Sequence, residues 1–154
     1  MGSPVSVNYS FAFIAKPCMT EQQIILVQKT WRIFRNIDPV LVGDVFYSRL
    51  FMEVPALRRL FKSPMPEQNK KLIDMIGVIV SRLERLDEVT PDIREMAKRH
   101  VGYGVKPAHY EAVGSALTWT LEHGLGVDWN PAVKEAWTAC YRMLADIMIA
   151  ASDY

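Results

Sequence analysis

Histidine is scarce in this chain, so the position of each imidazole is informative. The three histidines are His100, His109 and His123, and His100 lies at i+7 from Ile93, on the apolar side of a helical pattern that ends in a glycine-containing loop. That loop separates His100 from His109, so the two do not form the i, i+4 pair of a zinc helix. A single imidazole can still be the axial ligand of an iron whose equatorial ligands come from a cofactor. From spacing alone, the alternative of a hydrogen-bonded core histidine stays open.

Other kinds of chemistry have little support in the sequence. It contains no phosphate-binding loop, dinucleotide-binding fingerprint, serine-hydrolase elbow or H-E-x-x-H zinc motif. Cys18 and Cys140 lie far apart and form no zinc spacing, which fits a reducing cytoplasm. The 18 basic and 17 acidic residues leave a net charge of +1, too little to predict nucleic acid or an anionic membrane as a partner. No apolar run approaches the roughly 18 residues of a membrane span.

The elements that must position His100 are all predicted to be helices. At 154 residues the chain is long enough for one domain with its own core. Apolar residues recur at helical spacing, and no segment shows sustained strand-like alternation. Thr20, Asp38, Thr90 and Asn130 are expected to cap helices. Predicted helices begin near residue 20, at 39, at 55, near 68, at 91, at 107 and at 131, and the third ends by residue 61.

Two further expectations concern boundaries. Residues 1–19 show no helical period and are predicted to be an extension that is flexible or derived from cloning, whereas residues 20–154 form the folded domain. Gly102 and Gly104 are expected to take the positive φ angles that close the helix carrying His100, and Pro107 is expected to start the next helix.

Several motifs in this order resemble the globin domains of bacterial flavohaemoglobins and of their single-domain relatives. The resemblance covers roughly residues 20 to 150 and rests on VFYSRLF, PALRRLF, Gln68, KRHVGYGVKPAHYEAVG and EAWTACYRMLADIMI. It implies an all-α globin fold, with helices A, B, C, E, F, G and H around a haem pocket.

The resemblance also assigns roles to individual residues. In that family the histidine before the short loop is the proximal iron ligand, so His100 would be the metal ligand of a haem b (iron protoporphyrin IX), and Phe61 would stack on the haem. Tyr47 and Gln68 would form the catalytic distal pair, which hydrogen-bonds a ligand such as O2, NO or CO. Further cofactor contacts would come from Leu72, Val105 and Tyr110.

The implied function is reversible O2 binding at a pentacoordinate ferrous haem, with oxidation of NO to nitrate if an external electron donor or reductase supplies electrons. A haem-based gas sensor and a cofactor-free helical interaction protein are the alternatives. In the family, a tyrosine and a glutamate support the proximal histidine. Tyr110 matches the tyrosine, but Ser152 stands at the glutamate position, and the nearest acid is Asp153. We therefore expect a less basic imidazole and less peroxidase-like chemistry.

Overall fold

The computed structural model describes residues 19–152, and every element within that range is helical. The first helix of the described residues is α2 (Glu21–Phe34), and it begins with the predicted capping box. The Thr20 hydroxyl accepts from the Gln23 N–H at 3.1 Å, and the Gln23 side chain accepts from the Thr20 N–H at 3.0 Å. Residues 1–18 of the predicted extension lie outside the described residues, and Met19 lies within them. Asp153 also lies outside the described residues.

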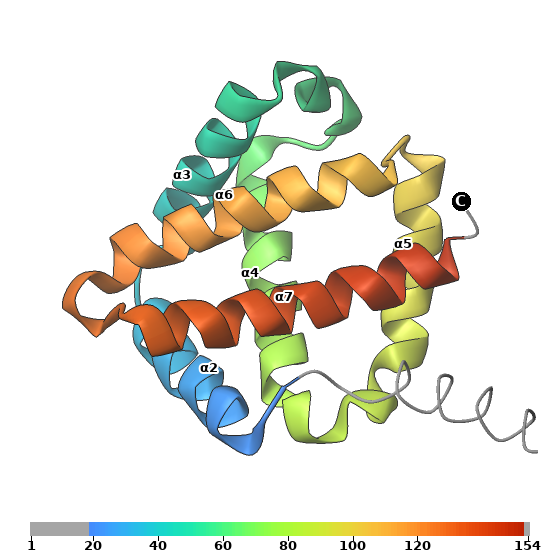
Figure 1. Ribbon diagram of the computed structural model, residues 1–154. Helices are drawn as coiled ribbons and strands as arrows, with labels where there is room; N and C mark the ends of the chain where they lie inside the picture. The colour runs from blue at the N-terminus through green and yellow to red at the C-terminus, as the bar shows by residue number, and fades with distance from the viewer. Residues whose placement is uncertain (1–18, 153–154) are drawn as a thin grey trace, which may run out of the picture.

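Within the described residues, seven further elements follow α2 before the last helix, α7, and Figure 1 shows them in chain order. Asp38 and Asn130 cap their helices as predicted, because each side chain accepts a hydrogen bond from a backbone N–H in the first turn. The elements are α3 (Pro39–Glu53), η1 (Pro55–Leu60), α4 (Met65–Ser81), η2 (Leu83–Glu88), α5 (Thr90–Gly102), α6 (Pro107–Leu125), η3 (Gly126–Asp128) and α7 (Pro131–Ala151).

The structure corrects three local expectations. Helix α4 begins at Met65 rather than near Gln68. Pro64 is its N-cap and Pro66 lies in its first turn, where proline is tolerated because the backbone N–H groups there have no partner within the helix. Thr90 does not cap α5: its hydroxyl donates to the Leu86 carbonyl at 2.8 Å, and it is already helical. Of the two glycines after His100, Gly104 takes a positive φ, of 96°, whereas Gly102 remains within α5.

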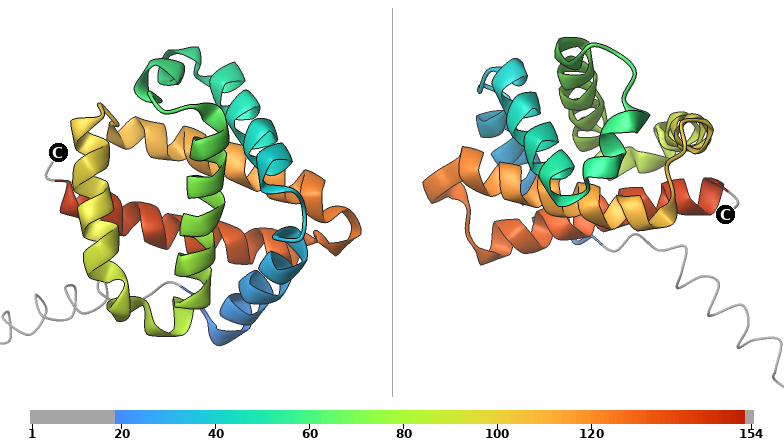
Figure 2. Two further views of the ribbon diagram at one scale, coloured as in Figure 1. Left: turned by 180° about the vertical axis from the view of Figure 1, so that it is seen from behind. Right: turned by 90° about the horizontal axis from the view of Figure 1, so that it is seen from above.

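Helices α6 and α7 form one layer that supports the others (Figures 1 and 2). Helix α2 and helix α5 both pack on α7, and α3 packs on α4 and α6. A buried hydrogen bond of 2.9 Å from the Trp137 indole N–H to the Thr30 hydroxyl joins α7 to α2. Within residues 19–152, α4 and α5 are connected through η2 and make almost no close backbone contact with each other. The facing sides of α4 and α5 therefore do not pack directly against each other.

Two apolar clusters fill the interior. The larger one runs between α2, α4, α5 and α7, and the smaller one is built around Phe46, Tyr47 and Leu50 of α3. Leu72 and Leu117 contact both clusters, so they mark the boundary between them. None of the helices in residues 19–152 has the length and apolarity that crossing a bilayer requires.

Candidate functional site

His100 lies in the last turn of α5, where the sequence places it on the side that faces the core. The ring is half-buried, and its Nδ1 lies 2.8 Å from the Met96 carbonyl oxygen, one turn earlier. A carbonyl can only accept, so Nδ1 carries the proton and Nε2 keeps its lone pair. Burial lowers the pKa of His100, the Met96 carbonyl opposes this, and nearby Arg99 lowers it further. A neutral imidazole with Nε2 as the only lone-pair atom is a metal ligand by its chemistry.

The loop after His100 is fixed by backbone hydrogen bonds. The His100 carbonyl accepts from the N–H groups of Tyr103 and Val105, at 3.1 and 3.0 Å. The positive φ of Gly104 allows this reversal, which a residue with a side chain would adopt only under strain. The next helix then begins with the His109 ring accepting from the Lys106 N–H at 3.0 Å. His109 therefore has a capping role at the start of α6.

Tyr47 lies in α3, within a group of aromatic rings. Its centroid is 4.9 Å from that of Phe46, 5.2 Å from Phe61 and 5.8 Å from Phe51. Burial raises the pKa of Tyr47, and a hydrogen bond with the Gln68 side chain acts in the opposite direction. The phenol is therefore protonated at neutral pH and available as a donor. The structure thus brings together Tyr47 and Gln68, which are 21 positions apart in the sequence.

A cleft of about 570 Å³ opens to solvent beside this tyrosine. Asp44, Ser48 and Met52 line it along α3, together with Phe51, Arg58 and Met65. Tyr47 is the only one of the predicted site residues in the lining. The cleft therefore gives small molecules a route from the surface to the tyrosine.

Half-buried apolar side chains lie on the helices that carry Gln68 and His100 and on the segments that follow His100. They come from α4, α5, the loop after it and α6, and they pack against the core while keeping part of their surface exposed: Leu72, Met75, Met96, Val105 and Leu117. Phe61, at the end of η1, is half-buried as well. Side chains of this chemical type suit an apolar, flat group such as a porphyrin held beside His100.

Tyr110 is buried in α6 and is held from the last helix. The Tyr141 hydroxyl donates to the Tyr110 carbonyl at 2.6 Å, and Gly114 leaves room for the Tyr141 ring, which an added Cβ would meet at 2.6 Å. Ser152 follows α7, and its hydroxyl donates to the Met148 carbonyl at 2.6 Å. A serine in this arrangement brings no negative charge toward Tyr110.

Asn69 is a site residue that sequence reasoning missed. Its side chain is fully buried, and Nδ2 donates to the Val40 carbonyl at 3.2 Å and to Asp44 Oδ1 at 2.9 Å. Gly43 permits this contact, because a Cβ there would collide with the Asn69 side chain. This bridge joins α3 to α4 beside Gln68 and three residues before Tyr47, so it sets the spacing of that pair. A lone Asn in a polar stretch gave no signal of burial.

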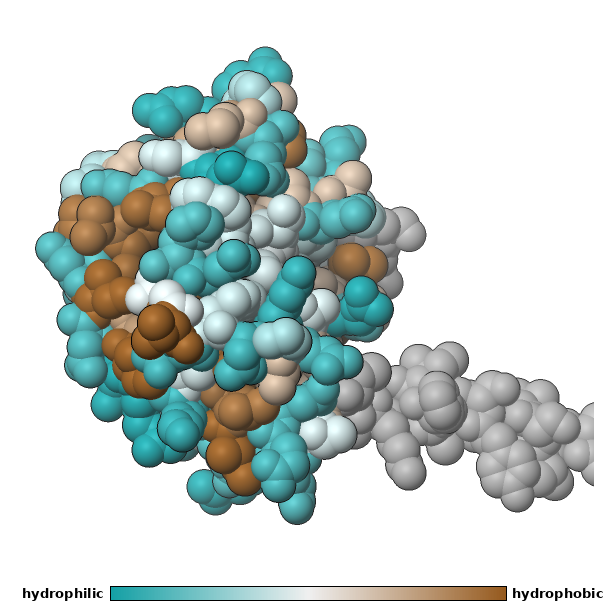
Figure 3. All heavy atoms as spheres, turned by 60° about the vertical axis from the view of Figure 1, so that its left-hand side comes forward, coloured by the Kyte–Doolittle hydropathy of each residue, from teal (hydrophilic) through white to brown (hydrophobic). Residues whose placement is uncertain are grey.

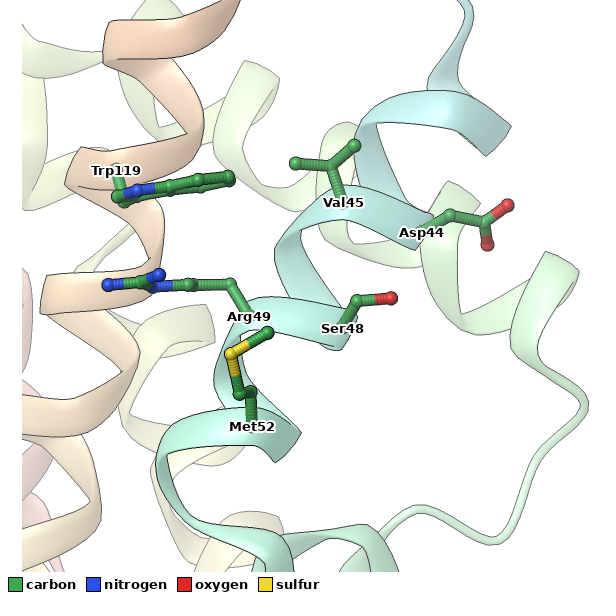
Figure 4. Close-up of a pocket in the computed structure, with 6 residues that line it drawn as sticks. All are labelled: Asp44, Val45, Ser48, Arg49, Met52 and Trp119. Atoms are coloured by element: carbon green, nitrogen blue, oxygen red, sulfur yellow. The ribbon is translucent and has the colours of Figure 1, made fainter.

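A second hollow, of about 300 Å³, lies between α3 and α6 (Figure 4). In its lining, the Arg49 side chain from α3 stacks on the face of the Trp119 ring from α6, with the guanidinium carbon 4.8 Å from the indole centroid. None of the predicted site residues lines it. On the face of the molecule shown in Figure 3, apolar areas are interrupted by polar ones. We therefore assign no chemistry to this hollow.

Metal binding by protein side chains alone has no support in the described part of the chain. Residues 19–152 contain no group of three or more His, Cys, Asp or Glu side chains placed to hold an ion. Cys140 is buried, and burial raises the pKa of its thiol to about 12. An iron held here would therefore need equatorial ligands from a cofactor.

Sequence comparison relates the chain to bacterial haem proteins. Flavohemoproteins of Vibrio cholerae and Oceanobacillus iheyensis are each 28% identical to it, over 134 and 141 residues, which is 85% and 86% of this chain. The chain spans about a third of their length, 34% and 35%. A protein of Aquifex aeolicus described as an uncharacterised globin-like protein is 32% identical over 132 residues, covering 80% of this chain and 92% of the relative.

Structure comparison agrees. A bacterial globin from Campylobacter jejuni superposes with a TM-score of 0.74 at 25% identity, covering 86% of this chain and 95% of that one. An engineered carbene transferase from Rhodothermus marinus gives a TM-score of 0.77 at 24% identity, covering 86% and 92%. The globin family pattern matches residues 44–148, which include Tyr47, Gln68 and His100. The predicted all-α globin fold is therefore confirmed, and the chain belongs to the globin family.

Proposed function

We propose that this globin binds haem b through His100 and uses it to bind O2 reversibly. The observation that carries the proposal is the hydrogen bond from His100 Nδ1 to the Met96 carbonyl, which fixes the ring and leaves Nε2 as the ligand atom. The half-buried apolar side chains described above support it, because they offer a surface that a porphyrin would cover. Phe61, Leu72, Val105 and Tyr110 are the proposed cofactor contacts.

When bound, haem supplies an iron that takes up O2 and that can combine O2, NO and one electron into nitrate. The residues of this chain hold the haem and orient its ligand. His100 fixes the group from α5, and the aromatic residues around Tyr47 form an apolar wall on the distal side. Tyr47 directs its O–H proton to the ligand, and Gln68 orients the phenol through their shared hydrogen bond.

We further propose that NO oxidation is open to this chain when an electron donor is present. The pair of buried Tyr47 and half-buried Gln68 favours this second activity, because a phenol and an amide together stabilise a ligand that gains negative charge. Ser152, whose hydroxyl donates to the Met148 carbonyl, supports O2 binding and NO oxidation over peroxidase-like chemistry, since a serine at this position brings no carboxylate that could increase the basicity of His100.

The absorption spectrum of the purified protein, reconstituted with haem, tests the proposal. We expect an intense Soret band that shifts between the ferric, ferrous and oxygenated forms. His100→Gly should lose the haem, and added imidazole should restore the spectrum, because a free ligand can occupy the space that the side chain leaves. His123→Gly is the matched control, since the His123 ring is exposed and stacks on Trp119 at 3.9 Å.

Two outcomes would contradict the proposal. A protein that takes up no haem would be a cofactor-free helical interaction protein. An unchanged ferrous spectrum in His100→Gly would remove His100 from the ligand role. Consumption of NO with an added reductase then separates an enzyme from a gas sensor, because a sensor binds NO without turnover.

A further inference from the structure

The fold gathers basic residues at one end of the molecule. Residues 55–71 comprise η1 and the first turns of α4, and residues 98–110 comprise the end of α5 and the start of α6. Both stretches lie at the same end, the upper one in Figure 1. They also contact each other, because an ideal Cβ on Gly104 would lie 3.3 Å from Leu60 Cδ2. We call these two stretches the basic rim.

The basic rim carries much more positive charge than the chain as a whole. It holds eight Lys or Arg residues and one acidic residue, a formal charge of +7, while the chain has a net charge of +1. The rest of the chain therefore carries −6. The basic side chains are all exposed: Arg58, Arg59, Lys62, Lys70, Lys71, Lys98, Arg99 and Lys106.

Local pairing removes only part of this charge. Lys70 pairs with Asp74 at 2.8 Å and Lys98 with Glu95 at 3.4 Å, and all four side chains are mostly exposed. Within residues 19–152, no other basic side chain of the rim lies within 4.0 Å of a carboxylate oxygen. The two propionates of a haem would subtract another two charges. A positive field therefore remains, and at low salt it extends over about 30 Å.

Two residues of the rim lie close to residues of the proposed haem site. Arg99 is the neighbour of His100 and is close enough to lower the pKa of its imidazole. Arg58 lies over the Phe51 ring, 5.5 Å from its centroid, and lines the cleft that leads to Tyr47. Charge at a redox site changes encounter rates with charged reductants by factors of about 10 to 1,000.

We propose that the basic rim is the docking surface for an acidic electron-donor protein, one that carries a reduced flavin or iron–sulfur group. In the reaction, one electron passes from the donor to the ferric iron, the donor is oxidised by one electron, and no covalent bond forms or breaks. This inference rests on the proposed function, because it needs a haem at His100. The sign of the field selects an acidic partner and disfavours a basic one.

Stopped-flow reduction of the ferric holo-protein tests the proposal with three probes. The ferrous EDTA complex is an anion, the hexaammineruthenium(II) ion is a cation, and a reduced flavodoxin with an acidic face represents the protein donor. We expect the rate with the EDTA complex and with flavodoxin to fall roughly tenfold or more as added salt shortens the screening length from about 30 Å to about 8 Å. The rate with the ruthenium ion should rise.

A charge-reversal pair locates the effect. Arg59→Glu combined with Lys62→Glu should slow both anionic donors severalfold and leave the haem spectrum unchanged. Lys29→Glu combined with Lys134→Glu makes the same change in net charge at exposed positions of α2 and α7, outside the rim, and should leave the rates close to wild type. Binding of oxidised flavodoxin, followed by calorimetry, provides a readout independent of turnover.

The outcomes separate the two proposals. If the purified protein forms no Soret band, the proposed function fails, and this inference fails with it. If the protein binds haem but the rim and control pairs change the rates equally, the docking surface is wrong while the haem proposal stands. If a short single-stranded DNA binds the rim and displaces flavodoxin, the rim is a nucleic-acid surface and the donor proposal is overturned.

Discussion

Removing the Tyr47 hydroxyl tests the distal site most directly. Tyr47→Phe keeps the ring, so its contacts with Phe46, Phe51 and Phe61 at 4.9 to 5.8 Å are preserved and the pocket hardly changes in volume. Bound O2 carries partial negative charge, and a hydrogen bond to a charged group is worth about 1.5 to 3 kcal/mol. Since about 1.4 kcal/mol corresponds to a factor of ten, O2 should dissociate roughly tenfold to a hundredfold faster.

Carbon monoxide is the control ligand, because it carries far less charge when bound. A loss of hydrogen bonding should therefore change CO dissociation much less, whereas a purely steric effect would act on both ligands alike. Stopped-flow displacement of O2 by CO on the wild type, Tyr47→Phe, Gln68→Leu and the double variant gives the rates. Because Tyr47 and Gln68 share a hydrogen bond, the single effects should not add. If Tyr47→Phe leaves O2 dissociation within about twofold of wild type, less than one such bond is worth, Tyr47 is a core aromatic and the distal proposal is refuted.

Three further predictions follow from other contacts. Resonance Raman of the deoxy form should give an iron–histidine stretching frequency near that of oxygen-storage globins, and this frequency should rise in Ser152→Glu. A peroxidase-like frequency in the wild type would contradict the assignment of Ser152. Gly43→Ala should lower the free energy of unfolding by about 1 to 3 kcal/mol in urea because the new methyl group meets a buried side chain of α4; Gly77→Ala, where the nearest atom is 3.6 Å away, should cost nothing. In a Cys18→Ser background, Cys140 should react with a thiol reagent at pH 8 only after urea unfolds the chain, because burial raises the pKa of its thiol to about 12. Fast labelling of the folded protein would show instead that the thiol is accessible.

Much of the fold could be predicted because its signals are local. Thr20, Asp38 and Asn130 cap their helices through contacts within three residues, and such contacts depend only on nearby sequence. The capping prediction failed at Thr90, where η2 precedes the helix directly and the Leu86 carbonyl takes the hydroxyl proton. A preceding 3₁₀ turn competes for the same side chain, and the sequence pattern does not reveal it.

The predicted site residues came from a resemblance, and the structure adds what spacing alone could not. Their helices bring Tyr47 and Gln68 into contact and leave His100 with one free lone pair, both of which depend on atoms rather than on residue types. Asn69 shows the limit of the pattern, since its burial depends on a glycine in another helix. An Asn among Lys and Gln residues looks solvated until α3 is placed against it.

Electrostatics shows the same limit on a larger scale. A net charge of +1 predicts no charged partner if charge is taken as a property of the whole chain. The fold brings residues 55–71 beside residues 98–110, although some 26 residues separate them, and concentrates a formal charge of +7 at the end of the molecule that carries His100. Since the field at a site depends on charges within about a screening length, the relevant quantity is this local sum. The folded chain therefore favours an acidic partner, although its overall composition predicts no charged partner.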